Sequence, residues 1–127
     1  MARIVHLAIK VDDLEAASRF YEEVFGFRHT ETNSKRGHTS RHLTDGTFDL
    51  ALVKYESETT TEADYAGPGP RLHHFGIAVD KTESFEEALR RHGCEILSKP
   101  GVLPIKFRAP GGVVAEISKA EDFPGVG

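Results

Sequence analysis

Two histidines occupy matching places in a repeated segment. Residues 5–12 align with residues 73–80 at a constant offset of 68, which superposes His6 on His74. Both segments alternate as strands do, and each histidine leaves its strand opposite the main apolar row. Small neighbours on that side leave room for a pocket over the sheet; they are Ala8, Gly76 and Ala78. An approximate two-fold axis between the repeats would bring the two imidazoles together, where neutral rings can bind a metal ion.

Glu116 is a carboxylate inside an apolar strand segment, 113–117. Burying an unpaired carboxylate is costly, so this group should be ion-paired, protonated, at an exposed edge or bound to a metal. Lys106 or Arg108 could supply the ion pair. In the metal interpretation, Glu116 joins the two histidines in a two-histidine, one-carboxylate set with open coordination positions.

A second group of polar residues lies on the expected strand 38–44. His38, Ser40 and His42 share one face of it. His42 could act as an acid or base, or orient a substrate oxygen; a half-exposed polar strand face is the alternative. Substrate carboxylates could be held by basic residues near strand ends, unless these are simply solvated: Arg41, Lys106 and Arg108. His73 alternates onto the apolar row and is interpreted as structural, with replacement of His74 as the alternative.

Each histidine-bearing strand is followed by an amphipathic helix that ends at a glycine, Gly26 or Gly93. Three short alternating segments come next: 27–31, 38–44 and 48–55 in the first half, and 95–98, 105–108 and 113–118 in the second. The prediction is therefore an α+β fold with two βαβββ modules, residues 3–55 and 71–120. Residues 56–70 are expected to form a linker or a mobile flap, and residues 121–127 a frayed tail.

Composition bounds the class of protein. The chain of 127 residues is 39% hydrophobic and 28% charged, which fits one globular domain over residues 1–127. No apolar run is long enough for a membrane helix, and His6 and Lys10 interrupt the opening segment as a signal peptide. With one cysteine and no export signal, a cytoplasmic location is expected. The net charge of −4 is scattered along the chain, which argues against a nucleic-acid partner.

These motifs together resemble the vicinal oxygen chelate superfamily, which includes glyoxalase I, extradiol dioxygenases, fosfomycin-resistance transferases, methylmalonyl-CoA epimerase and bleomycin-binding proteins. The resemblance runs from IVHLAIKVDDLEAASRFYEEVFGF through LHHFGIAV to FRAPGGVVAEIS. It implies paired βαβββ modules whose mixed sheets curl into an open barrel around a divalent metal, held by His6, His74 and Glu116. Iron, manganese, zinc, nickel and cobalt remain open. Relatives are most often homodimers, and their modules pair either within one chain or between chains.

The resemblance also raises the question of a fourth ligand. Relatives such as glyoxalase I take it from the last strand of the first module. Aligning Gly46 with Gly111 puts Ala51, which cannot ligate, at the position that matches Glu116. Asp49 lies two residues earlier on the same face and could serve only if the register shifted by two. Asp49 and His42 are therefore the candidate catalytic residues.

The expected function is a metal-dependent enzyme acting on a small substrate that chelates the metal through two oxygens. A glyoxalase-like lyase or isomerase, of the lactoylglutathione lyase type, has the broadest family support. The three-ligand set instead resembles ring-cleaving dioxygenases. The alternatives are a fosfomycin-type thiol transferase and a non-catalytic binding protein of the bleomycin resistance type.

Overall fold

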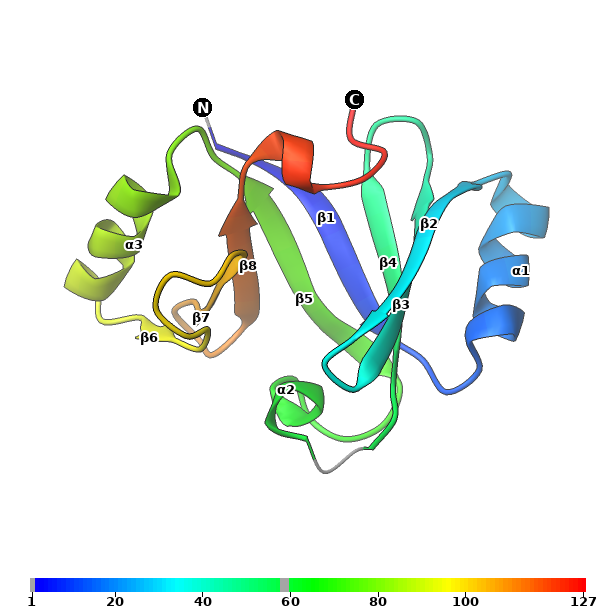
Figure 1. The fold of residues 1–127 in the computed structure, drawn as a ribbon, viewed down its shortest axis with the longest axis horizontal. Coiled ribbons are helices and arrows are strands. Elements are labelled where there is room, and N and C mark those ends of the chain that lie inside the picture. Colours follow the sequence, from blue (N-terminus) through cyan, green and yellow to red (C-terminus); the bar gives the residue numbers. More distant parts are fainter. Residues whose placement is uncertain (1, 58–59) are drawn as a thin grey trace.

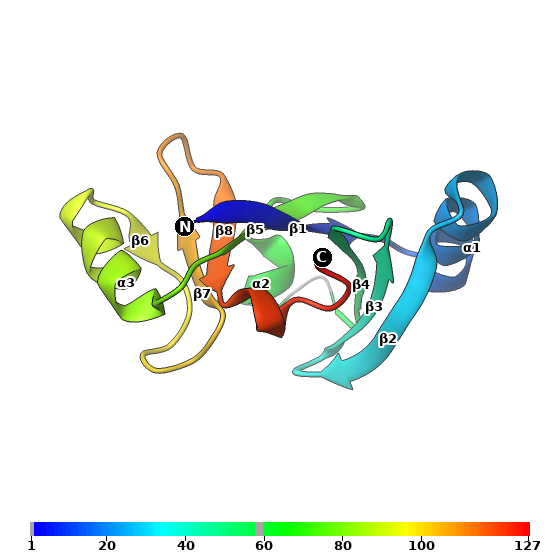
Figure 2. The ribbon, with the colours of Figure 1, turned by 90° about the horizontal axis from the view of Figure 1, so that it is seen from above.

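The computed structural model of the chain describes residues 2–57 and 60–127. Within them the strands form one curled mixed sheet in the order β2-β3-β4-β1-β5-β8-β7-β6 (Figures 1 and 2). The first module contains β1 (Arg3–Lys10), α1 (Leu14–Phe25), β2 (Arg28–Lys35), β3 (His38–Thr44) and β4 (Asp49–Tyr55). The second contains β5 (Arg71–Ala78), α3 (Thr82–Arg91), β6 (Glu95–Ile96), β7 (Ile105–Arg108) and β8 (Val114–Ser118). The predicted α+β class with two βαβββ modules is confirmed.

The two modules join within this chain through β1 and β5, which pair antiparallel. In that register Leu7 lies opposite Phe75, His6 opposite Gly76, and Ala8 opposite His74. The last strand of each module pairs parallel to the first, β4 with β1 and β8 with β5. An approximate two-fold axis thus passes through the Leu7–Phe75 pair and relates one half of the sheet to the other.

Apolar packing holds each helix against its own half of the sheet, and Figure 1 shows α1 and α3 at opposite ends of it. Under α1 the buried leucines of β3 and β4 pack with Leu14 and Tyr21 of the helix; they are Leu43, Leu50 and Leu52. Under α3, Leu89 packs on a second buried cluster: Val79, Ile105, Phe107, Ala115 and Ile117. Because strand side chains alternate, the residues between these apolar ones face the other side of the curled sheet, where the polar side chains collect.

The segment between the modules is anchored by hydrogen bonds over residues 60–70. It contains a short helix, α2 (Thr61–Asp64). The buried Lys10 Nζ donates hydrogen bonds of 2.9 Å to the carbonyl oxygens of Ala63 and Gly67. The guanidinium of Arg108 donates to the carbonyl oxygen of Tyr65 at 3.1 Å. These bonds fix α2 against the mouth of the sheet.

The tail is also ordered, which corrects the expectation of a frayed end. It forms a single 3-10 turn (Ala120–Asp122), after which Phe123 is buried. The Phe123 ring packs beside Val5 and Ala78 and lies 5.2 Å from the His6 ring, centroid to centroid. Thr44 Oγ1 donates to the carbonyl oxygen of Gly125 at 2.8 Å. The tail is ordered because the apolar side chain of Phe123 packs against distant residues, and no local sequence pattern reveals this contact.

None of the helices in the described part of the chain has the length and apolarity that crossing a membrane would take.

Candidate metal centre

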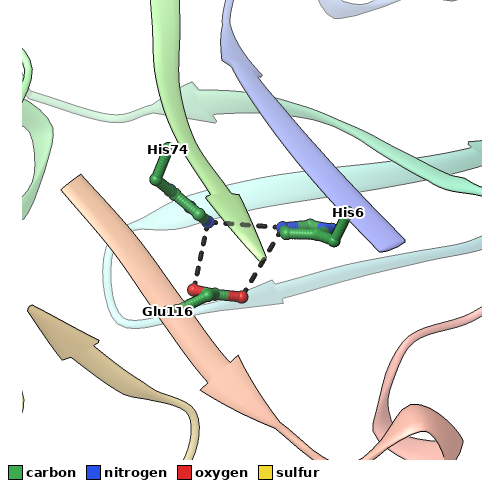
Figure 3. Close-up of side chains that lie close together, drawn as sticks. All are labelled: His6, His74 and Glu116. Atoms are coloured by element: carbon green, nitrogen blue, oxygen red, sulfur yellow. Dashed lines mark hydrogen bonds and ion pairs between the residues drawn. The ribbon is translucent and has the colours of Figure 1, made fainter. Parts of the chain in front are cut away.

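His6 on β1, His74 on β5 and Glu116 on β8 point toward one centre (Figure 3). The two Nε2 atoms of the histidines are 3.3 Å apart. The carboxylate of Glu116 places Oε1 at 3.0 Å from Nε2 of His74 and Oε2 at 3.5 Å from Nε2 of His6. The side chains of all three are at most 8% exposed. The structure therefore brings together the three residues predicted as metal ligands.

The strand register explains this convergence. Glu116 pairs with Gly76 on β5, and Gly76 pairs with His6 on β1, so the acid and the first histidine flank a glycine. A Cβ added at Gly76 would lie 2.8 Å from His6 Cβ and 2.9 Å from Phe123 Cε1. Only a residue without a side chain leaves His6 room to turn toward the centre.

Asp49 fixes the tautomer of His6. Its Oδ2 lies 2.6 Å from Nδ1 of His6, and the carboxylate is fully buried. Burial alone would raise the pKa of Asp49, but hydrogen bonds from His42 and His6 outweigh it and lower that pKa below its usual value. An ionised carboxylate can only accept, so Nδ1 of His6 carries the hydrogen. The lone pair of His6 is then on Nε2, which faces the centre.

Hydrogen bonds from His74 to His73 and from His73 to Glu62 fix the tautomer of His74. As in His6, the hydrogen is on Nδ1. The carbonyl oxygen of Glu62 lies 2.7 Å from Nε2 of His73, so this nitrogen carries the hydrogen. Burial, with a smaller contribution from His74, lowers the pKa of His73 to about 4, so the His73 ring is neutral and its Nδ1 can accept. His74 Nδ1 donates to it at 2.7 Å. The lone pair of His74 is therefore also on Nε2, and burial lowers the pKa of His74, which keeps the ring neutral.

The donor set fits a divalent cation. Two nitrogen lone pairs and a carboxylate meet at the centre, and the tautomers leave no hydrogen between them. Burial would raise the pKa of Glu116, yet the charged groups around it, among them the Lys106 ammonium at 3.6 Å, lower it overall, so the carboxylate is ionised. Two neutral imidazoles and one carboxylate are the ligands of three-residue sites for iron, manganese, zinc, nickel or cobalt.

Ala51 occupies the position where relatives carry a fourth ligand, which we call the fourth corner. It pairs with Ala8 on β1 just as Glu116 pairs with Gly76 on β5, so it is the two-fold counterpart of Glu116. Asp49 pairs with His6 instead, so the two-residue register shift that would make it a ligand does not occur. The structure thus places Asp49 behind the histidine, away from the fourth corner.

His42 shares the Asp49 carboxylate. Its Nδ1 lies 2.8 Å from Oδ1 of Asp49, while Nδ1 of His6 takes Oδ2. The rings of His42 and His6 are stacked with centroids 6.3 Å apart. The His42 side chain is 14% exposed and lines the cleft. Because Asp49 occupies Nδ1, Nε2 is the nitrogen of His42 that a ligand in the cleft can reach.

Of the three residues predicted to bind substrate, only Lys106 lines the cleft. Its Nζ lies 3.0 Å from Oε1 of Glu62 and 3.6 Å from Oε1 of Glu116. Arg41 is on the outer face of β3, where its guanidinium pairs with Glu15 of α1 at 2.9 Å. Arg108 bonds the carbonyl oxygens of Tyr65 and Gly112. Strand alternation turns Arg41 away from the centre. Arg108 is on the same face of β7 as Lys106, but its guanidinium is held by backbone carbonyl oxygens, and neither arginine lines the cleft.

The cleft around the centre measures about 270 Å³. Besides the residues above, its lining includes His38, Ser40 and Tyr55. The buried Nδ1 of His38 has no hydrogen-bond partner among the described residues, and Glu62 Oε2 is 3.6 Å from it. The shared face of β3 that the sequence predicted is therefore one wall of the cleft.

Two contributors to the site, Glu62 and His73, are not marked by the sequence pattern. Glu62 lies in the segment between the modules, where no periodicity or motif marks it, so the sequence carries no signal for it. The alternation of its strand indicates a structural role for His73, and the adjacent pair His73–His74 is the signal for a ring that supports its neighbour.

The sequence matches the Glyoxalase/Bleomycin resistance protein/Dioxygenase superfamily over residues 3–117, and the chain belongs to this superfamily. No curated protein matches the sequence.

Solved structures share the fold. A hypothetical protein from Bacillus halodurans has a TM-score of 0.79 at 19% identity, covering 93% of this chain and 94% of that one. Methylmalonyl-CoA epimerase from Mycobacterium tuberculosis has a TM-score of 0.74 at 19% identity, covering 91% and 86%. The epimerase from Streptomyces coelicolor, in complex with 2-nitronate-propionyl-CoA, has a TM-score of 0.76 at 22% identity, covering 91% and 94%.

Proposed function

We propose that the protein is a metal-dependent enzyme acting on a small substrate that chelates the metal through two oxygens. The observation that carries this proposal is the convergence of Nε2 of His6, Nε2 of His74 and the Glu116 carboxylate, with both histidine tautomers fixed from behind. A divalent ion held there would polarise a bound carbonyl and acidify the neighbouring C–H bond. Lys106 stands beside Glu116 and can receive a substrate oxygen.

Proton transfer by His42 is the chemistry the cleft supports best. Nε2 of His42 is available to a ligand, while Asp49 accepts the hydrogen on Nδ1 and holds the ring in one tautomer. His42 would take the proton from the carbon next to a chelated carbonyl. Return of this proton to the other face of the carbon gives an epimerase, and its return to another atom gives an isomerase. Loss of a neighbouring group from the deprotonated substrate gives a lyase. The similar fold of methylmalonyl-CoA epimerases supports this class.

A ring-cleaving dioxygenase is the second candidate. The observation that favours it is Ala51 at the fourth corner, which leaves two histidines and one carboxylate as the donor set. That set is the one associated with ferrous iron in oxygen chemistry. Oxygen uptake with a panel of catechols, measured on protein loaded with ferrous iron, tests it.

The deciding experiment combines metal analysis with isotope exchange. Purified protein is expected to contain close to one divalent ion per chain, and H6A to contain none. In deuterated water, metal-loaded protein is expected to exchange the acidic C–H of malonyl-type thioesters or of hemithioacetals, followed by NMR. H42N should keep the metal and lose the exchange. A protein that takes up no divalent ion would overturn the proposal, and full exchange in H42N would remove His42 from it.

We further propose a cytoplasmic homodimer. The lone cysteine, Cys94, is a free thiol, which suits a reducing compartment. Leu72 and Val113 are 61% and 55% exposed and line an apolar hollow of about 350 Å³ together with Leu7 and Phe75. A second copy of the chain covering this hollow would bury them. Analytical ultracentrifugation should show a dimer for the natural protein and a monomer for L72D; a monomeric natural protein would refute the dimer.

A further inference from the structure

A second hollow adjoins the metal cleft. It measures about 470 Å³ and lies between α2 and the loop that connects β6 to β7. The two spaces share four lining residues: Arg36, Glu62, Pro104 and Lys106. We call this hollow the side groove. The two spaces therefore adjoin at these residues, and a molecule bound at the centre lies next to the side groove.

The side groove is largely apolar. Val102 and Leu103 of the loop are 36% and 48% exposed and line it together with Leu97 and the ring of Tyr65. Large apolar side chains left open to water at the edge of a ligand cleft are typical of a surface that a ligand covers.

Charges in the side groove are mostly arranged at its boundary with the cleft. The ammonium of Lys106 and the carboxylate of Glu62 are 3.0 Å apart and neutralise each other. The two other charged residues of the lining, Arg36 and Lys99, are exposed to solvent. The aliphatic stem of a lysine can line an apolar path. Nζ of Lys106 is 3.6 Å from Oε1 of Glu116, so the path into the groove begins one side chain from the proposed metal ligands.

The two volumes also indicate an extended ligand. The metal cleft, at about 270 Å³, falls just below the range of roughly 300–1,000 Å³ that small-molecule sites occupy. The side groove alone exceeds the cleft. A substrate no larger than its chelating group would leave the larger and more apolar space unused.

We propose that the substrate is an amphiphile: a two-oxygen chelating head bound at His6, His74 and Glu116, joined to an apolar tail that lies in the side groove. This inference rests on the proposed function and adds the substrate class. The tail passes over Lys106 and Pro104 and contacts Val102 and Leu103. Substrates with an alkyl, acyl or aryl extension next to the chelating oxygens are then preferred over the bare head.

Acetohydroxamic and octanohydroxamic acid test this, because they share one chelating head and differ only in the tail. Their affinities for protein loaded with cobalt or zinc are measured by calorimetry. The longer compound should bind at least about tenfold more tightly, since its methylenes leave water. V102D and L103D, both in an exposed loop, should each remove most of that preference and leave the acetohydroxamic acid affinity unchanged. V24D is the matched control, because Val24 is 60% exposed on α1, away from the groove.

Each outcome decides the matter. Equal affinity for the two compounds, or a preference that survives in both V102D and L103D, would overturn the tail assignment while the chelating function stands. A preference lost equally in V24D would show non-specific binding and overturn it too. If L103D changes the oligomeric state and not the ratio, the groove is a contact between copies of the chain. If neither compound binds the metal-loaded protein, the proposed function fails and this inference with it.

Discussion

The two modules share a scaffold and differ in the side chains at three matching places. On the last strand and its neighbour, the first module has His42 opposite Ala51, and the second has Lys106 opposite Glu116. Two residues before these corners, Asp49 in the first module matches Val114 in the second. The last strand of each module thus carries one acid facing the cleft, at a different position.

The carboxylates of the two modules have different surroundings because they occupy different positions on the last strand. In the second module the acid is at the corner, where it completes the donor set, and Lys106 balances it. In the first module the acid sits behind the histidine, where it orients two rings and leaves the corner open. The two-fold repeat explains why the histidines meet. In the proposed function, the departure from it would let one side of the cleft bind a metal and the other move a proton.

The largest effect is expected from removing the acid of the second module. E116A should lose all measurable affinity for divalent ions. This loss is larger than the 10–100-fold loss of affinity that is typical when a residue hydrogen-bonded to a metal ligand is removed. The double variant A51E/E116A should regain part of it, because the introduced carboxylate would occupy the two-fold counterpart of the lost corner. Calorimetric titration with zinc or cobalt measures both. Tight metal binding by E116A would show that the corner is not a ligand position.

Acid should destabilise the metal-free protein through the second module. Because the folded chain lowers the pKa of His73 to about 4 from its ordinary value of 6.5, the unfolded chain binds more protons between these values. The free energy of unfolding is therefore highest, as far as His73 is concerned, above pH 6.5. It falls by about 3 kcal/mol as the pH decreases toward 4. Urea unfolding from pH 4 to 7.5 should show this slope, and H73N should flatten it. An equal slope in H73N would assign the effect elsewhere.

Asp49 is the matching support in the first module. D49N keeps the shape of the side chain but removes the charge that holds Nδ1–H of His6, so metal affinity should fall about 10–100-fold. D12N is the control, since Asp12 is exposed and outside the cleft. Isothermal titration of the two variants side by side measures the difference. Unchanged affinity in D49N would mean that His6 needs no partner behind it.

The smallest effect comes from the matched pair Gly76 and Ala8. G76A should cost about 2 kcal/mol of unfolding free energy, because the added Cβ would meet the His6 side chain and the Phe123 ring. A8G, the reverse change in the first module, should cost about 1 kcal/mol through backbone entropy. Thermal unfolding of both variants compares them. A neutral G76A would show that the site relaxes around the methyl group.

The sequence predicted what repeats. The offset of 68 identified both modules and brought His6 to His74, and the apolar context of Glu116 marked it as unusual for a carboxylate. The structure places all three around one centre. It also agrees with the placement of Ala51 at the matching corner, which followed from aligning two glycines.

Features that depend on contacts between distant segments could not be predicted from the sequence. Arg41 and Arg108 are basic residues near strand ends in either interpretation. Only the folded structure shows that Arg41 pairs with Glu15 and that Arg108 bonds the carbonyl oxygen of Tyr65. Glu62 lines the cleft because Lys10 binds its segment, a contact between residues more than fifty positions apart. Phe123 covers His6 through tertiary packing alone.

The carboxylate that His6 and His42 share makes the two rings compete for a single negative charge. A proton arriving on His42 would draw Asp49 toward that ring and leave Nδ1–H of His6 less well compensated, which makes His6 a weaker electron donor. If His42 acts as the proposed base, the electron density offered to a bound ion would fall when His42 takes the substrate proton and rise again when His42 returns it. Ion and base would be electrically linked through two oxygens of one side chain.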